Sequence, residues 1–174
     1  IDDLHHHVID RMLATPLHRG AIITARILHA SATVVVQSVI ILVLAFILGA
    51  GWPSFVGTIG VLLAAALITA GFTAMSTGVA LLARREETMI AVINFFGLPL
   101  AFLSATFMSS QLMPEWMQTV AKANPVNWAV SAARHAVLET DPSAVWVNSG
   151  LLFVFTLVMV LLATGAFRIY RRST

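Results

Sequence analysis

The chain has 174 residues, of which 59% are hydrophobic and 10% are charged, and its mean hydropathy is +0.90. Soluble domains carry about 25% charged residues, so this composition excludes an ordinary soluble fold. The net charge of +2 gives no basis for a nucleic-acid partner, and the absence of cysteine excludes disulfides and thiolate-bound metals. We therefore expect an all-α polytopic membrane protein.

Residues 1–29 are predicted to form a cytoplasmic elbow, or coupling region. Over residues 1–15, apolar side chains recur at three- and four-residue spacing, which is typical of an amphipathic helix lying along a membrane. Pro16 ends or kinks this helix, because proline lacks a backbone N–H and clashes with the preceding turn. The alternative is a solvated linker, which has no reason to keep an apolar stripe.

The membrane region, residues 30–174, is predicted from stretches that contain no Asp, Glu, Lys, Arg or His. These stretches are residues 30–83, 88–114 and 142–167. A spanning helix needs about 20 apolar residues, so the first stretch holds two helices and each of the others holds one. The four predicted spans are residues 30–48, 56–82, 89–112 and 145–167.

The second predicted span carries small residues at four-residue spacing: Ala66, Ala70, Ala74 and Gly78. Such a row lets another helix approach closely, which is one way that helices associate in lipid. We expect the partner helix either in this chain or in a second copy.

Residues 113–143 are predicted to form a helical cap outside the membrane. Pro114 and Pro125 each suit the first position of a helix. Two short amphipathic helices, residues 115–123 and 126–138, are therefore expected to lie along the membrane surface. The residues assigned to this extracellular hairpin are Pro114, Trp116, Asn124, Pro125, Trp128 and Arg134.

The arginines predict the orientation of the spans. With four spans, the basic residues before the first, between the second and third, and after the fourth share one face. The other face has only Lys122 and Arg134. Cytoplasmic loops carry the excess of basic residues. We therefore predict a multi-pass protein of the cell membrane, with both ends of this segment in the cytoplasm and the cap outside.

Few polar side chains lie within the predicted spans. Each needs a partner, because an unpaired amide in hydrocarbon is costly. They either form hydrogen bonds between helices or line a path for an amphipathic solute, and the sequence does not decide between these roles. The candidates for the substrate path are Gln37, Ser38, Thr73 and Asn94.

Several kinds of chemistry are absent from the sequence. No ionisable residue lies in the predicted spans, which disfavours a proton- or ion-coupled transporter. The single lysine, Lys122, follows Val-Ala, so there is no phosphate-binding loop of the G-x-x-x-x-G-K-[ST] type. His5, His6 and His7 point about 100° apart on a helix and do not converge on one ion. No catalytic or metal site is predicted, and a lipid-modifying enzyme is disfavoured.

Two segments resemble the type-2 ATP-binding-cassette (ABC) exporter permeases. In residues 10–26, Thr15-Pro16 precedes the basic Arg19, which is similar to the cytoplasmic elbow of that family. The second segment combines Pro-Leu-Ala-Phe-Leu-Ser (99–104), Met-Pro-Glu-Trp (113–116) and Asn-Pro-Val-Asn-Trp (124–128) with Arg134. The resemblance is closest to the daunorubicin-resistance-like multidrug permeases. It covers residues 10–172, as the last four of six expected spans.

The resemblance implies a permease subunit of an ATP-driven efflux system. Two nucleotide-binding ATPase subunits would hold ATP and Mg, this chain would bind no cofactor, and a second permease copy or homologue would complete the pore. The elbow would transmit closure of the ATPase dimer through Arg11, Leu13, Ala14, Thr15, Pro16 and Arg19. The expected cargo, within surrounding membrane lipids, is a hydrophobic or amphipathic drug, antibiotic, lipid or glycolipid. The alternative is a non-transporting membrane scaffold or immunity partner that binds a ligand at its outer hairpin.

Overall fold

The computed structural model describes residues 19–83, 86–104, 106 and 112–170. Within these ranges the chain is helical and contains no strand. The helices are α2 (Arg19–Ile47), α3 (Phe55–Ala83), α4 (Glu86–Phe102), α5 (Glu115–Lys122), α6 (Pro125–Leu138) and α7 (Pro142–Tyr170). The predicted elbow up to residue 18, which includes Pro16 and the three histidines, lies outside the described residues.

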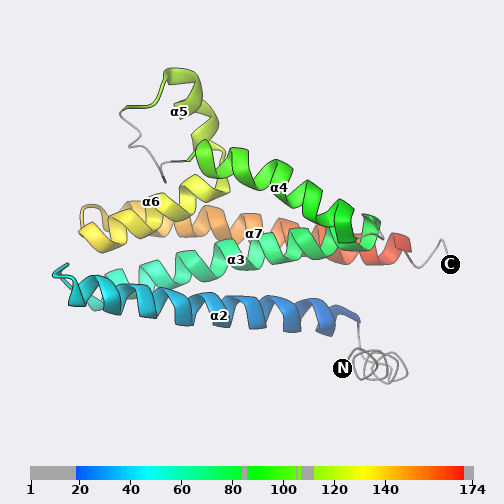
Figure 1. Cartoon of the computed structure of the whole chain (residues 1–174), viewed down its shortest axis with the longest axis horizontal. Coiled ribbons are helices and arrows are strands. Elements are labelled where there is room, and N and C mark those ends of the chain that lie inside the picture. Colours follow the sequence, from blue (N-terminus) through cyan, green and yellow to red (C-terminus); the bar gives the residue numbers. More distant parts are fainter. Residues whose placement is uncertain (1–18, 84–85, 105, 107–111, 171–174) are drawn as a thin grey trace.

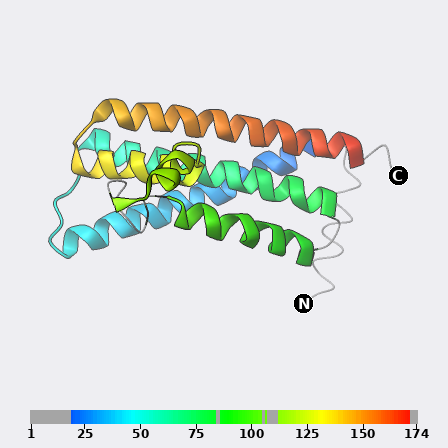
Figure 2. The same ribbon diagram turned by 90° about the horizontal axis from the view of Figure 1, so that it is seen from above.

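Three long helices form the body of the molecule. Figures 1 and 2 show α2, α3 and α7 running side by side, with α3 between the other two. Each contains an apolar segment long enough to cross a membrane: Thr24–Ile47, Phe55–Ala80 and Pro142–Ala166. These helices match three of the predicted spans. The first apolar segment begins before residue 30, however, and therefore includes Arg26 and His29.

The helix of the third predicted span is shorter than expected. It ends at Phe102, not at residue 112, so the prediction of one continuous helix is wrong. Pro99 lies in the last turn of α4 and has no backbone N–H, so it cannot form the helical hydrogen bond to the preceding turn. The chain then turns at Ser104, whose hydroxyl donates to the carbonyl of Ala101 at 2.6 Å.

Small residues bring α3 and α7 together. A side chain at Gly78 would lie 3.3 Å from the Cα of Ala163, and one at Gly71 would meet the ring of Phe155. Ala74 is fully buried. The predicted row of small residues therefore packs mainly against α7 of the same chain. Ala66 is the exception, because it faces α2, where its carbonyl accepts a hydrogen bond from Ser31 Oγ at 3.4 Å.

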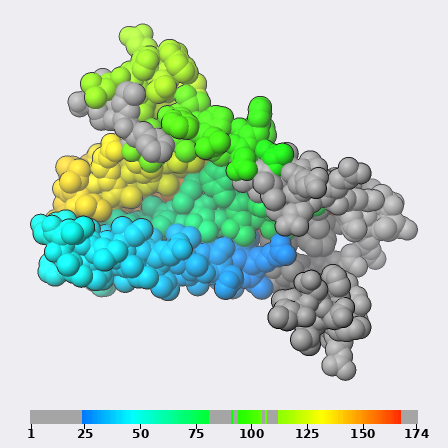
Figure 3. Space-filling model, viewed as in Figure 1, coloured from blue at the N-terminus to red at the C-terminus, as the bar shows by residue number. Residues whose placement is uncertain are grey.

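Helix α6 lies alongside α3 and α7, not across their ends (Figure 1). Its Ala132 forms the buried centre of the molecule with Ala64 of α3 and Leu152 of α7, and Trp128 packs against this cluster. The prediction that both short helices lie along the membrane surface is therefore wrong for α6. Helix α5, in contrast, stands out from the body, as the space-filling view in Figure 3 also shows.

Candidate functional site

The junction between α4, α5 and α6 is held by one buried side chain, Asn124. Its Nδ2 donates to the carbonyls of Leu100 and Leu103, at 2.7 and 3.1 Å, at the end of α4. Its Oδ1 accepts from the backbone N–H of Val126 at 2.9 Å, as the N-cap of α6. Asn124 is 2% exposed. One amide therefore caps the end of one helix and the start of another.

Trp128 closes the neighbouring helix α5. Its indole Nε1 donates to the carbonyl of Lys122, the last residue of α5, at 2.7 Å. Pro125 occupies the first turn of α6, as predicted, whereas Pro114 precedes α5 as its N-cap. The segment from Asn124 to Trp128 thus satisfies backbone carbonyls of both α4 and α5.

This junction lies at about half the length of α3. Ala136 of α6 lies against Gly57 and Gly60 near the start of α3. One to two turns earlier along α6, Ala132 and Trp128 reach the level of Ala64 and Ile68. From Ser54 to Ile68, α3 rises about 20 Å, while the whole helix has 29 residues. The helix break at Asn124 is therefore placed near the middle of the body.

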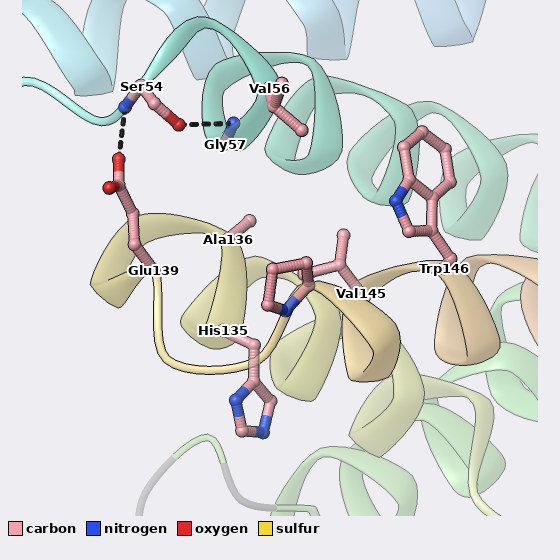
Figure 4. Close-up of a pocket in the computed structure, with 9 residues that line it drawn as sticks. Ser54, Val56, Gly57, His135, Ala136, Glu139, Val145 and Trp146 are labelled. Carbon is pink, nitrogen blue, oxygen red and sulfur yellow. Dashed lines mark hydrogen bonds between the residues drawn. The ribbon is translucent and has the colours of Figure 1, made fainter.

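The C-terminal end of α6 meets the starts of α3 and α7. We call this end of the molecule the Ser54 end. A pocket of about 300 Å³ lies there. Figure 4 shows Glu139 on one side of it and Trp146 on the other. The carboxylate of Glu139 accepts from the backbone N–H of Ser54 at 2.5 Å. That hydrogen bond, with a further one from the Ser54 side chain, lowers the pKa of Glu139 below its ordinary value.

The start of α7 is capped by Asp141. Its carboxylate accepts from the hydroxyl of Ser143 at 2.7 Å and from the backbone N–H of Ala144 at 3.3 Å. These two bonds lower the pKa of Asp141. Nearby, His135 Nδ1 lies 2.8 Å from the hydroxyl of Thr140. The acidic side chains at the Ser54 end are therefore used to cap helices.

A second hollow lies between α2 and α3, toward the Arg19 end of the body. Its volume is about 440 Å³. Arg26 of α2 lines it together with one face of α3, formed by Ile68, Thr69, Phe72, Thr73, Ser76 and Thr77. We call this site the α2–α3 hollow. It combines the positive charge of Arg26 with the hydroxyl groups of four α3 residues.

The predicted path residues are distributed over three helices. Thr73 lines the α2–α3 hollow, Ser38 is half-buried on α2, and Gln37 and Asn94 are exposed on α2 and α4. Of the predicted coupling residues, only Arg19 lies within the described residues, as the first residue of α2. Arg11, Leu13, Ala14, Thr15 and Pro16 lie outside them. Trp116 is exposed on α5, and Arg134 is exposed on α6.

Sequence reasoning missed the role of Glu139 and the hollow that Arg26 and Ser76 line together. The role of Glu139 was not predictable from local sequence, because the carboxylate of a capping box normally belongs to the residue three positions after the N-cap. That position is Gly57 in this chain. Across the described part of the chain, no cluster of three or more metal-ligating side chains is found.

The sequence is similar to known transport proteins. The sequence pattern of the ABC-2 type transporter family matches residues 3–138. The chain is 27% identical, over 98% of its length, to the daunorubicin resistance ABC transporter permease protein DrrB1 of Streptomyces coeruleorubidus, covering 60% of that protein. Two algal proteins named "Putative transport permease ycf38" are also similar. That of Porphyra purpurea is 26% identical over 76% of this chain and 46% of its own length. That of Cyanophora paradoxa is 28% identical over 88% of this chain and 52% of its own length.

The chain thus spans about half of each relative's length. No solved structure matches it. The family pattern covers most of the chain, residues 3–138, including the segment around Asn124. This polytopic membrane protein therefore belongs to the ABC-2 type transporter family.

Proposed function

We propose that the chain is part of the membrane-spanning permease subunit of an ATP-driven exporter. Its cargo is a hydrophobic or amphipathic compound that moves outward across the cell membrane. Two ATPase subunits bind ATP and Mg and supply the energy, and this chain binds neither. A second permease copy, or a homologue, completes the translocation path.

The observation that carries this proposal is the helix break at Asn124, halfway along the body. Within a bilayer, irregular backbone is tolerated only where it is buried in protein or lines a cavity. Many transporters place such discontinuous helices beside the substrate path. Asn124 satisfies the exposed carbonyls of α4 at this depth, so the break is a stable part of the structure.

The chemistry of the surface supports an amphipathic cargo. Large apolar side chains are exposed along α4, with Phe95 73% and Phe102 63% exposed, and the polar Asn94 lies next to the first of these. In the proposed pore, α4 faces the second permease, with Asn94 and Gln37 offering hydrogen bonds to polar groups of the cargo. The name of the Streptomyces relative, a daunorubicin resistance permease, is consistent with a cargo of this class.

Orientation follows from the arginines, as the positive-inside tendency predicts. The Arg19 end faces the cytoplasm, where the elbow meets the ATPase. The Ser54 end and α5 lie toward the outside. Leu13, Thr15 and Arg19 contact the ATPase subunit and transmit its closure.

Transport in inside-out vesicles tests the proposal. Vesicles carrying the permease and its ATPase should accumulate daunorubicin, used as a fluorescent probe, only when ATP is present. Arg19→Glu should uncouple transport while ATP hydrolysis continues, because it reverses a charge at the ATPase contact. Glu115→Lys is the control, since it reverses a charge on α5 at the end away from the break, and should leave transport intact. Equal transport by wild type and Arg19→Glu would contradict the role of Arg19 in coupling. Uptake that does not depend on ATP would contradict the proposal of an ATP-driven exporter.

A labelling experiment tests the orientation separately. A cysteine introduced at Thr140, which is exposed between α6 and α7, should react with a membrane-impermeant maleimide in intact cells. Labelling only after lysis would reverse the proposed topology. The 174 residues contain no other cysteine.

A further inference from the structure

The α2–α3 hollow has a chemical character that the transport proposal does not use. Arg26 lies inside the apolar segment Thr24–Ile47, although a charged side chain in hydrocarbon is costly. Within the described part of the chain, no ion pair joins Arg26 to a carboxylate. We therefore expect the guanidinium of Arg26 to pair with an anionic group from outside these residues.

The position of Arg26 along α2 places it at the edge of the hydrocarbon. The segment Thr24–Ile47 has 24 residues, which corresponds to about 36 Å of helix, against about 30 Å of hydrocarbon. If the segment is centred, the boundary falls about 3 Å inside Thr24, at the level of Arg26. At this depth an arginine can reach lipid headgroups.

The facing residues of α3 reach the same depth. The segment Phe55–Ala80 has 26 residues, or about 39 Å of helix, so its boundary falls about three residues before Ala80, at Thr77. The hydrogen bond of Ser31 to the carbonyl of Ala66 places the backbone of Arg26, five residues earlier on α2, opposite about Gly71 and Phe72 of α3. Its side chain leans toward the N-terminus of α2 and lines the α2–α3 hollow together with Thr77. Thr73 and Phe72 lie one turn deeper, and Ile68 lies about one turn deeper still.

The hydroxyl groups in the hollow differ in what they can donate. Thr77 Oγ1 donates to the carbonyl of Thr73 at 2.8 Å, so its proton is already used. Within the part of the chain that the structure describes, the hydroxyls of Thr73 and Ser76 form no hydrogen bond. With the five N–H groups of Arg26, Ser76 and Thr73 form a set of donors suited to an anion.

We propose that the α2–α3 hollow binds an anionic phospholipid from the leaflet at the Arg19 end. Its phosphate pairs with Arg26 and accepts a hydrogen bond from Ser76 at the hydrocarbon boundary. One acyl chain extends toward the middle of the bilayer along Phe72 and Ile68. Along the hollow, the only charged side chain among the described residues, Arg26, lies with Ser76 and Thr77 toward the boundary, and the large apolar side chains Phe72 and Ile68 lie deeper, beside Thr73 and Thr69, which suits a headgroup followed by an acyl chain. Charge complementarity with Arg26 favours an anionic lipid over a zwitterionic one.

Native mass spectrometry of the purified protein in detergent tests this site without any transport assay. The probes are phosphatidylglycerol, phosphatidylcholine and the water-soluble glycerol phosphate. Wild type should retain phosphatidylglycerol in preference to phosphatidylcholine. Arg26→Gln should lower the retention of phosphatidylglycerol about tenfold, because a charge-assisted hydrogen bond is lost. Arg26→Lys keeps the charge and should retain most of the preference.

Two further variants separate this site from general charge effects. Lys122→Gln removes one positive charge on α5, away from the hollow, and should bind like wild type. Thr73→Trp fills the hollow while leaving Arg26 in place, and should also release phosphatidylglycerol. Unchanged binding by Arg26→Gln, or equal loss in Lys122→Gln, would overturn the proposal. Competition by glycerol phosphate at the same concentration as the lipid would show a site for free phosphate compounds and would overturn the lipid assignment.

Discussion

The carboxylate of Glu139, at the end of α6, accepts a hydrogen bond from the backbone N–H of Ser54, at the start of α3. The hydroxyl of Ser54 in turn accepts from the N–H of Gly57 at 3.1 Å. In a capping box both bonds come from one helix, with Glu or Gln at its third position. Here that position is glycine, because a side chain would collide with the carbonyl of Ala136. A residue 85 positions along the chain supplies the carboxylate instead.

Replacement of Glu139 by Gln should lower the thermal stability of the protein in detergent at pH 7. The pKa of Glu139 is lowered below its ordinary 4.5 in the folded protein. A lowered carboxylate pKa stabilises the fold above the unfolded pKa, and the effect is lost as the pH falls through the folded pKa. The difference between wild type and Glu139→Gln should therefore be present at pH 7 and vanish below the folded pKa.

Thermal midpoints at pH 7 and in steps down through pH 4 measure this effect. The control is Glu115→Gln, which removes an exposed carboxylate from α5 and should shift the midpoint less. A gap between wild type and Glu139→Gln that does not change with pH would contradict the capping role.

Replacement of Gly57 by Ala should destabilise the protein by about 1–3 kcal/mol, the usual cost of overpacking. The added methyl group would meet the backbone carbonyl of Ala136 and the ring of Pro53, and backbone does not move aside as a flexible side chain does. Gly150→Ala is the matched control. Nothing lies within 4 Å of its added methyl group, and alanine favours a helix over glycine by up to about 1 kcal/mol.

Denaturation of both variants in the same detergent checks the prediction. Gly57→Ala should unfold earlier than wild type, and Gly150→Ala should unfold at the same point or later. Equal stability of the two variants would show that α3 and α6 are not packed as closely as the structure has them.

The sequence predicted the long helices well, because their evidence is local. Uncharged stretches of sufficient length determine α2, α3 and α7, and glycine and proline mark the turn before α3. Pro125 likewise marked the start of α6. The end of α4 was not predictable in this way, because residues 99–104 are nearly all apolar and carry no break stronger than Pro99.

The depth of α6 and the role of Asn124 depend on tertiary contacts. An Asn-Pro pair indicates an N-cap, which the structure contains. Nothing local indicates that the same amide also reaches Leu100 and Leu103. That role requires α4 to stop beside it. Likewise, the approach of Ala136 to Gly57 and Gly60 brings α6 alongside α3, and neither residue is distinctive by itself.

Replacement of Trp128 by Phe should destabilise the protein by about 1 kcal/mol, the typical value of one hydrogen bond. Phenylalanine keeps an aromatic ring against the Ala64–Ala132–Leu152 cluster but cannot donate to the carbonyl of Lys122. Hydrogen exchange should increase at the end of α5. Trp116→Phe is the control, since Trp116 is 61% exposed, and it should change stability by less than about 0.5 kcal/mol. Equal effects of the two variants would contradict the capping of α5 by Trp128.

Replacement of Asn124 by Asp should have the largest effect of these changes, about 3 kcal/mol or more. The side chain keeps its shape and can still accept from the N–H of Val126. It loses both donated hydrogen bonds, however, and turns a buried negative charge toward the carbonyls of Leu100 and Leu103. Asn124→Ser is the matched comparison, because serine is a good N-cap but is too short to replace both bonds to α4. Its cost should be smaller, about 1–3 kcal/mol.

Thermal unfolding and hydrogen exchange together distinguish the two roles of Asn124. In both variants the backbone at residues 100–104 should exchange faster than in wild type, whereas the first turn of α6 should stay protected in Asn124→Ser. If α6 lost protection first in both variants, Asn124 would act only as an N-cap. The break between α4 and α6 would then have to be held by other contacts, and the stable mid-body break that supports the transport path would lose its structural basis.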